Sequence, residues 1–105
     1  MDATEFEKQA DRAFERLERA LEATDVDFAL KEGGVFELEF DDGSKIIVNR
    51  HGAAREIWVA ARSGGFHFRW DGSAWRDTRD GAELFSALSR LVSEQLGRGI
   101  RLGLG

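Results

Sequence analysis

Acidic side chains recur every three or four residues through the first quarter of the sequence. The series consists of Glu7, Asp11, Glu15, Glu18, Glu22 and Asp25, and Asp27 follows two residues later. On a helix this spacing places carboxylates along one side. Carboxylate oxygens are hard ligands that suit Fe³⁺, Ca²⁺, Mg²⁺ and Mn²⁺. Since exposed carboxylates form no closed cage and the sequence has no cysteine, the pattern predicts weak and poorly selective metal binding.

The same acids also fit a simpler interpretation, a helix face that is only solvated. A second stripe, Lys8, Arg12, Arg16 and Arg19, lies beyond the first on the same helix and neutralises part of its charge. Two features favour a functional surface. Acids three or four residues apart repel one another, and the series continues past the helix into Asp25 and Asp27.

A tryptophan on the outer face of a predicted strand is the second candidate feature. Strand residues alternate between the two faces, so a buried Ile57, Val59 and Ala61 place Trp58 outward, beside Asn49 of the preceding strand. A large exposed aromatic side chain typically marks a binding surface. The alternative is that a neighbouring loop or a long side chain covers the indole ring.

Hydrophobic periodicity predicts the elements that position these residues. A helix over residues 4–23 would begin with a capping box formed by Thr4 and Glu7. Six strands follow at about 26–31, 36–40, 45–49, 56–61, 66–70 and 75–78, and a second helix from residue 84 ends at Gly97. The tail, residues 98–105, has no predicted element. This order predicts an α+β fold, a two-layer α-β sandwich with both helices on one face of an antiparallel sheet.

Composition limits the classes of function. We expect 105 residues to form one domain, and no apolar run is long enough to span a membrane. The acidic N-terminus is unlike a secretion signal, so we expect a cytoplasmic protein. The whole net charge of −5 lies in residues 1–27, which carry nine acids and four bases. Without a basic patch, nucleic acid is not an expected partner.

No pattern of an ordinary active site is present in the sequence. The serines lack a nucleophile motif, and the Gly-Gly pairs fit turns instead of phosphate-binding loops. Phe66, Phe68 and Trp70 share one strand face, where they could stack on bases. Because a basic surface is missing, we interpret them as core residues under the helices. We therefore expect a binding protein and not an enzyme.

Residues 43–81 resemble the frataxin (CyaY) family. The matching positions are Asn49, Ile57, Trp58, Gly64, Gly65, Phe66, Phe68, Trp75, Asp80 and Gly81. The resemblance implies the α-β sandwich expected from periodicity. It also implies an acidic ridge that binds iron, Fe²⁺ or Fe³⁺, weakly and reversibly, with other divalent cations competing. Glu18, Glu22, Asp25 and Asp27 match that ridge, and Glu15 and Asp11 lie one and two turns earlier.

The resemblance further implies that one face of the sheet contacts the proteins that assemble iron–sulfur clusters. Asn49 and Trp58 match it, and His51, Glu56 and His67 complete the candidate partner-binding set. Glu56 replaces a common glutamine and adds a negative charge. The expected partners are a cysteine desulfurase and an iron–sulfur scaffold protein, bound by a monomer or by oligomers that form with iron. Two alternatives stay open: a ferroxidase-type protein that oxidises or stores iron, and a docking adaptor that needs no metal.

Overall fold

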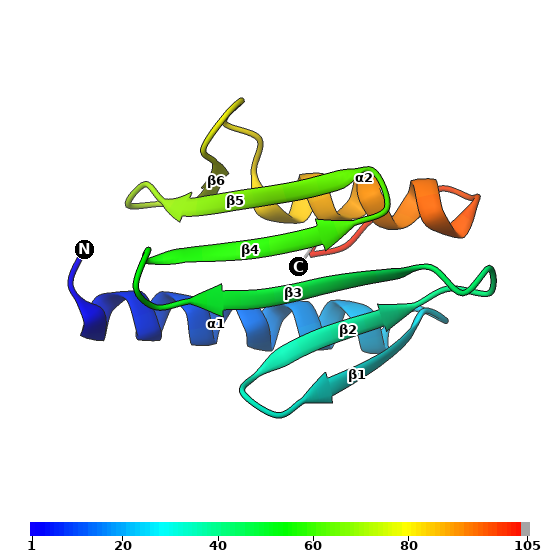
Figure 1. Cartoon of the computed structure of the whole chain (residues 1–105), viewed down its shortest axis with the longest axis horizontal. Coiled ribbons are helices and arrows are strands. Elements are labelled where there is room, and N and C mark those ends of the chain that lie inside the picture. The colour runs from blue at the N-terminus through cyan, green and yellow to red at the C-terminus, as the bar shows by residue number, and fades with distance from the viewer. Residues whose placement is uncertain (104–105) are drawn as a thin grey trace.

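The computed structural model describes residues 1–103, and these form one open antiparallel sheet with helices on a single face (Figure 1). The elements in chain order are α1 (Ala3–Glu22), β1 (Asp27–Lys31), β2 (Val35–Glu39), β3 (Lys45–His51), β4 (Glu56–Ala61), β5 (Gly64–Trp70), β6 (Trp75–Asp77) and α2 (Leu84–Leu96). The strands lie in the sheet in their sequence order. The predicted α+β, two-layer α-β sandwich is confirmed. Neither described helix is long and apolar enough to cross a membrane.

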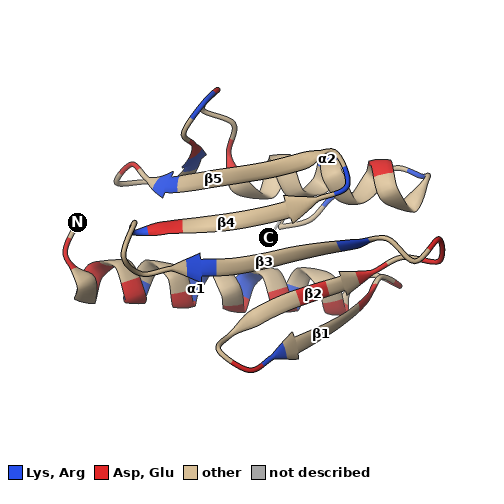
Figure 2. Ribbon diagram, viewed as in Figure 1, with Lys and Arg blue, Asp and Glu red and all other residues tan. Residues whose placement is uncertain are grey.

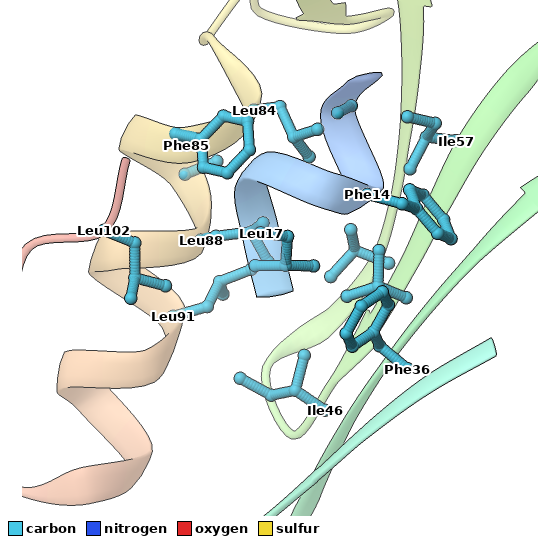
Figure 3. Packing of buried hydrophobic residues seen from close by; sticks show 14 of the residues in the cluster. Phe14, Leu17, Phe36, Ile46, Ile57, Leu84, Phe85, Leu88, Leu91 and Leu102 are labelled. Atoms are coloured by element: carbon cyan, nitrogen blue, oxygen red, sulfur yellow. The ribbon is translucent and has the colours of Figure 1, made fainter. Parts of the chain in front are cut away.

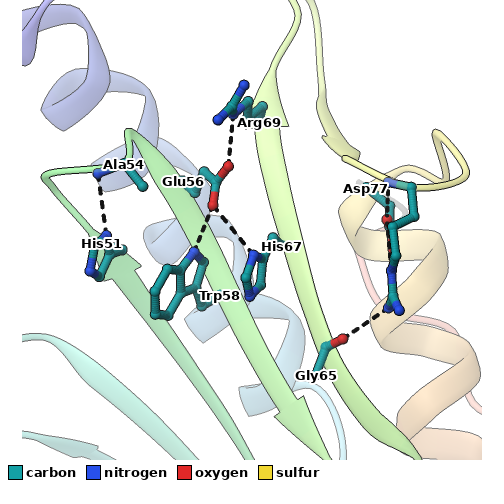
Figure 4. Close-up of polar contacts among 9 residues, drawn as sticks. His51, Ala54, Glu56, Trp58, Gly65, His67, Arg69 and Asp77 are labelled. Carbon is teal, nitrogen blue, oxygen red and sulfur yellow. Dashed lines mark hydrogen bonds and ion pairs between the residues drawn. The ribbon is translucent and has the colours of Figure 1, made fainter.

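The core lies between the helices and the inner face of the sheet. Helix α1 turns one apolar stripe inward, from Phe6 to Leu21, and the strands contribute alternate residues. Phe14 of α1 meets Phe36 of β2 edge to face, with ring centroids 5.5 Å apart. Leu88 of α2 packs beside Leu17 of α1 (Figure 3). Both helices of residues 1–103 lie on the same face of the sheet, and the opposite face carries Trp58 (Figure 1, Figure 4).

The start of α1 differs from the predicted capping box. The helix begins at Ala3, and its N-cap is Asp2, whose carboxylate accepts the backbone N–H of Glu5 at 2.8 Å. Thr4 and Glu7 therefore lie inside the first turns of the helix. An aspartate at the N-cap satisfies a free N–H and opposes the positive end of the helix dipole, which makes Asp2 the better starting residue.

We expect Asp2→Ala to lower the free energy of unfolding by about 1 kcal/mol, the usual cost of losing an N-cap. Thr4→Ala is the matched control, and it should change stability by no more than about 0.5 kcal/mol because exposed helix positions tolerate substitution. Urea unfolding of both variants measures the difference. A larger loss for Thr4→Ala than for Asp2→Ala would restore the predicted capping box.

Two apolar residues lie further from the core than expected. Apolar alternation in the strand predicted over 26–31 places Leu30 on the inner face with Val26 and Phe28, but Leu30 is 54% exposed. Its strand β1 is an edge strand of the sheet, next to β2 only (Figure 1). Trp70, predicted as a core residue, is half-buried at the other side of the sheet, and the buried indole is that of Trp75, 3% exposed.

The C-terminal residues fold back onto the helices. Helix α2 ends as predicted at Gly97, which adopts a left-handed conformation with φ of 81° and donates its N–H to the Ser93 carbonyl. Leu102 is 4% exposed, and its N–H donates to the hydroxyl of Ser89 at 2.8 Å. Residues 98–103 have no helix or strand. The rest of the tail, residues 104–105, lies outside the described residues, as does that end of the domain predicted over residues 1–105.

Candidate functional site

Six carboxylates form the acid ridge, which follows α1 and continues into β1. We give this name to Asp11, Glu15, Glu18, Glu22, Asp25 and Asp27. Figure 2 shows acidic positions repeated along α1. Glu18 is half-buried, and the other five residues are exposed. These acids are therefore accessible to solvent, and their role as a binding surface stays a prediction.

Two ridge acids are neutralised by arginines from distant parts of the chain. Arg50 of β3 donates to Asp11 at 2.8 Å and to Glu7 at 3.0 Å, while its guanidinium lies over the ring of Phe14. Arg98, after α2, pairs with Asp25. A cation that binds Asp11 or Asp25 competes with the charge of an arginine already paired with that carboxylate. These two residues are consequently weaker candidates for metal ligands than spacing alone suggests.

The other four ridge acids have no counter-ion in the described part of the chain. Within residues 1–103, Glu15, Glu18, Glu22 and Asp27 make no side-chain hydrogen bond or ion pair. In the same residues, no three of the His, Asp and Glu side chains gather closely enough to hold a metal ion together. Exposed carboxylates that do not converge can attract a cation but give it few simultaneous ligands. Their chemistry fits loose binding of a hard cation, and it does not fit a permanent metal centre.

One acid beside the ridge was not among the predicted residues. Glu39 of β2 lies directly opposite Asp27 of β1, and its side chain is 60% exposed. Lys45 of β3 contacts Glu39 at 3.6 Å and Glu37 at 2.6 Å. The hydrogen bond and charge of Lys45 lower the pKa of Glu37, although partial desolvation opposes them. Counting back from the turn at Gly33 and Gly34 could have paired Asp27 with Glu39.

The second candidate feature is the sheet patch, which comprises Asn49, His51, Glu56, Trp58 and His67. Strand register places Trp58 of β4 between Asn49 of β3 and His67 of β5. Trp58 lies on the outer face, as predicted, but it is half-buried. The ring of His51 stacks on one side of the indole at 3.9 Å and 6°, and His67 stacks on the other at 4.6 Å and 11° (Figure 4). The two imidazoles fix the orientation of the indole.

Glu56 departs from the expectation of an outward, accessible side chain. It lies on the outer face but is only 5% exposed, because the neighbouring side chains cover it. Its carboxylate accepts the indole N–H of Trp58 at 2.8 Å and the Nε–H of Arg69 at 2.7 Å, and Nδ1 of His67 lies 3.6 Å away (Figure 4). Glu56 therefore positions Trp58 and offers little of its own surface to a partner.

The electrostatics of the sheet patch keep Glu56 ionised. Burial alone would raise the pKa of Glu56, but the hydrogen bonds from Trp58 and Arg69 and the positive charge of Arg69 together hold that pKa below its ordinary value. Protonation would weaken both hydrogen bonds. The hydrogen bond that anchors the indole N–H is therefore at full strength in the neutral range and weakens when the pH falls through the lowered pKa of Glu56.

Asn49 and His51 occupy the end of β3 and the loop that follows it. The side-chain amide of Asn49 donates to the Arg50 carbonyl at 3.4 Å, which leaves its oxygen unbonded within the described residues. Nδ1 of His51 accepts the backbone N–H of Ala54 at 3.2 Å. The loop thus holds the imidazole ring in its stack on Trp58. All five predicted patch residues lie together, and four of them reach the surface.

Comparison of this sequence with known families and proteins gives consistent matches. A family model described as a frataxin-like domain matches residues 1–98. The chain is 62% identical over 104 residues to the iron-sulfur cluster assembly protein CyaY of Dechloromonas aromatica, covering 97% of this chain and 99% of that one. It is 50% identical over 97 residues to the protein of the same name from Cupriavidus necator, covering 91% and 87%.

Solved structures agree with the sequence comparison. The frataxin from Psychromonas ingrahamii superposes with a TM-score of 0.86 at 29% identity, covering 96% of this chain and 97% of that one. A trimeric frataxin from the yeast Saccharomyces cerevisiae, in a complex with ferrous iron, superposes with a TM-score of 0.66 at 26% identity, covering 90% and 87%. Similarity thus extends over the acid ridge and the sheet patch alike.

Proposed function

Because the chain belongs to the frataxin-like family, of which CyaY is a member, we propose that it modulates iron–sulfur cluster assembly by docking on a cysteine desulfurase and its scaffold protein. The observation that carries this proposal is Trp58, a half-buried indole fixed on the face of the sheet opposite the two helices. A rigid aromatic side chain loses little conformational entropy on binding, which suits an interface anchor.

The acid ridge supplies the electrostatic part of docking. Its unpaired carboxylates, Glu15, Glu18, Glu22 and Asp27, would meet a basic surface on the desulfurase. Complementary charge accelerates encounter and orients the partner, and the effect weakens with salt. The apolar anchor and the charged ridge therefore contribute differently: Trp58 slows dissociation, and the ridge speeds association.

Iron would be a cargo that the acid ridge binds weakly and reversibly. The donor set fits, since exposed carboxylates bind hard cations and exchange them readily. Glu18, Glu22 and Asp27 would attract the ion, with Glu15 one turn earlier, although no three of them converge on one point. Arg50 and Arg98 compete for Asp11 and Asp25. Iron and the desulfurase would then compete for the same carboxylates, which makes docking sensitive to iron concentration.

An adaptor that needs no metal is the second candidate function. The ion pairs of Asp11 and Asp25 favour it, because they leave fewer acids for a cation. Binding of the desulfurase that is unchanged by iron would support the adaptor. A ferroxidase would instead consume oxygen when Fe²⁺ is added, and an oxygen electrode tests that alternative directly.

Paramagnetic broadening by Mn²⁺ should locate the metal site. We expect the backbone amide signals of residues 15–27 to broaden first in a titration followed by ¹H–¹⁵N spectra, and those around Asp11 to broaden later because Arg50 is paired with it. Arg50→Gln should remove this delay, since Asp11 is then free. Broadening confined to His51 and His67 would move the metal site to the sheet patch and contradict the ridge assignment.

A further inference from the structure

A cavity lies beside the basic stripe of α1, the name we give to Lys8, Arg12, Arg16 and Arg19. It has a volume of about 350 Å³ and opens between α1, the β5–β6 turn and the start of α2. Its apolar wall includes Trp70, Trp75 and Phe85, and Arg12 and Arg16 stand beside that wall. Neither the acid ridge nor the sheet patch contributes a residue to this cavity. Its size is at the lower end of the range for small-molecule sites.

The two arginines at the cavity differ in what they can do. Arg16 is held in place, because it donates to the Gly103 carbonyl and its guanidinium lies 4.0 Å from the centre of the Phe85 ring. Arg12 is exposed and has no hydrogen bond or ion pair with any side chain or carbonyl of residues 1–103. Arg16 therefore forms part of the wall, and Arg12 is available to pair with an anion.

The indole of Trp75 forms a fixed part of the cavity wall. Trp75 is 3% exposed, and its ring contacts Trp70 at 5.7 Å and Phe6 at 5.9 Å between centroids. Its Nε1–H is the one buried side-chain polar atom without a hydrogen-bond partner in the described part of the chain. An unsatisfied buried donor costs free energy.

A carboxylate in the same cavity wall limits the negative charge that a ligand can carry. Glu83 lines the cavity, and it accepts the backbone N–H groups of Phe85 at 2.8 Å and Ser86 at 3.1 Å at the start of α2. Its negative charge disfavours a polyanion such as a phosphate ester, because like charges would lie close together. A singly charged ligand can keep its distance from Glu83 while it pairs with Arg12.

We infer that this cavity binds a small organic monocarboxylate with a flat apolar body. The carboxylate pairs with Arg12, and the apolar body packs against the aromatic wall of Trp70, Trp75 and Phe85. The inference rests on contacts separate from those used for docking or iron. It assigns the basic stripe of α1 a role of its own and makes this protein a receptor for a small molecule as well as a docking partner.

Binding of naphthalene-2-carboxylate to the full chain, without iron or partner proteins, tests the site. In ¹H–¹⁵N spectra we expect saturable shifts of the indole N–H signals of Trp75 and Trp70 and of the amides near Ala13 and Ala74, which line the cavity. Naphthalene-2-carboxamide, a neutral molecule of the same shape, should bind about fivefold more weakly because it cannot form the ion pair. Equal affinity of the two compounds would overturn the inference.

Matched variants of the basic stripe complete the test. Arg12→Gln should weaken naphthalene-2-carboxylate binding about fivefold, while Arg19→Gln, on the same stripe but outside the cavity wall, should leave it unchanged. Both positions are exposed, so both variants should fold. Shifts spread over the whole surface, absence of saturation, or equal loss in both variants would refute the site. Because no iron or desulfurase is present, such a failure leaves the proposed docking function untouched.

Discussion

Trp58→Ala is expected to weaken binding to the desulfurase–scaffold complex about thirtyfold, which corresponds to about 2 kcal/mol. The indole is held on both sides by His51 and His67 and through its N–H by Glu56. It is therefore already in one orientation before the partner arrives. Because the indole is already immobile in the free protein, it loses little conformational entropy on binding. Its removal should therefore cost most of the affinity that the contact provides. Surface plasmon resonance with the immobilised complex measures the loss.

The free energy of unfolding shows whether Trp58→Ala weakens binding by removing a contact or by destabilising the fold. Because the stacked rings stabilise the sheet as well, Trp58→Ala should lower the free energy of unfolding by about 1 to 2 kcal/mol. Trp75→Ala, which empties a core position, should cost about 3 to 5 kcal/mol. The matched control for binding is Trp70→Ala, which removes a half-buried indole from the helix side of the sheet. Equal loss of affinity in Trp58→Ala and Trp70→Ala would place the binding face elsewhere.

Reversing two ridge charges should weaken docking about tenfold at low salt, equivalent to about 1.4 kcal/mol. The variant is Glu18→Lys with Glu22→Lys, at positions that lie off the buried stripe of α1. Because the ridge acts through charge, the deficit should appear mainly in the association rate. It should shrink as salt rises, since exposed charges are screened beyond a Debye length.

A second double reversal controls for net charge. Glu32→Lys with Glu94→Lys changes the net charge equally, at exposed positions outside the ridge. Its affinity should stay within about twofold of the parent, because charge far from an interface contributes little at moderate salt. An unchanged affinity of the ridge variant at low salt, or an equal deficit in the control, would remove the ridge from the docking account.

The fold could be predicted because each element has its own local signal. Alternating apolar residues such as Phe36 and Leu38 indicate strands, the spacing of Phe6, Ala10 and Leu17 indicates a helix, and Gly97 marks a helix end. These signals depend on neighbours a few residues away. The register that brings Asn49, Trp58 and His67 together follows from the short connections between their strands.

Burial and charge pairing could not be predicted in the same way. Glu56 is covered because Trp58, His67 and Arg69 fold over it, which depends on side-chain orientations that alternation does not specify. Trp75 replaces Trp70 in the core because of where the helices lie over the sheet. The counter-ions of Asp11 and Asp25 lie 39 and 73 residues away in the chain. Only the three-dimensional arrangement reveals such pairs.

The most direct test of the docking account is the rate of cluster assembly by purified desulfurase and scaffold, measured with and without this protein over a series of Fe²⁺ concentrations. The account predicts that the protein changes the rate, that the size of the change depends on iron, and that Trp58→Ala largely abolishes it. The same rate with and without the protein at every iron concentration would contradict the account.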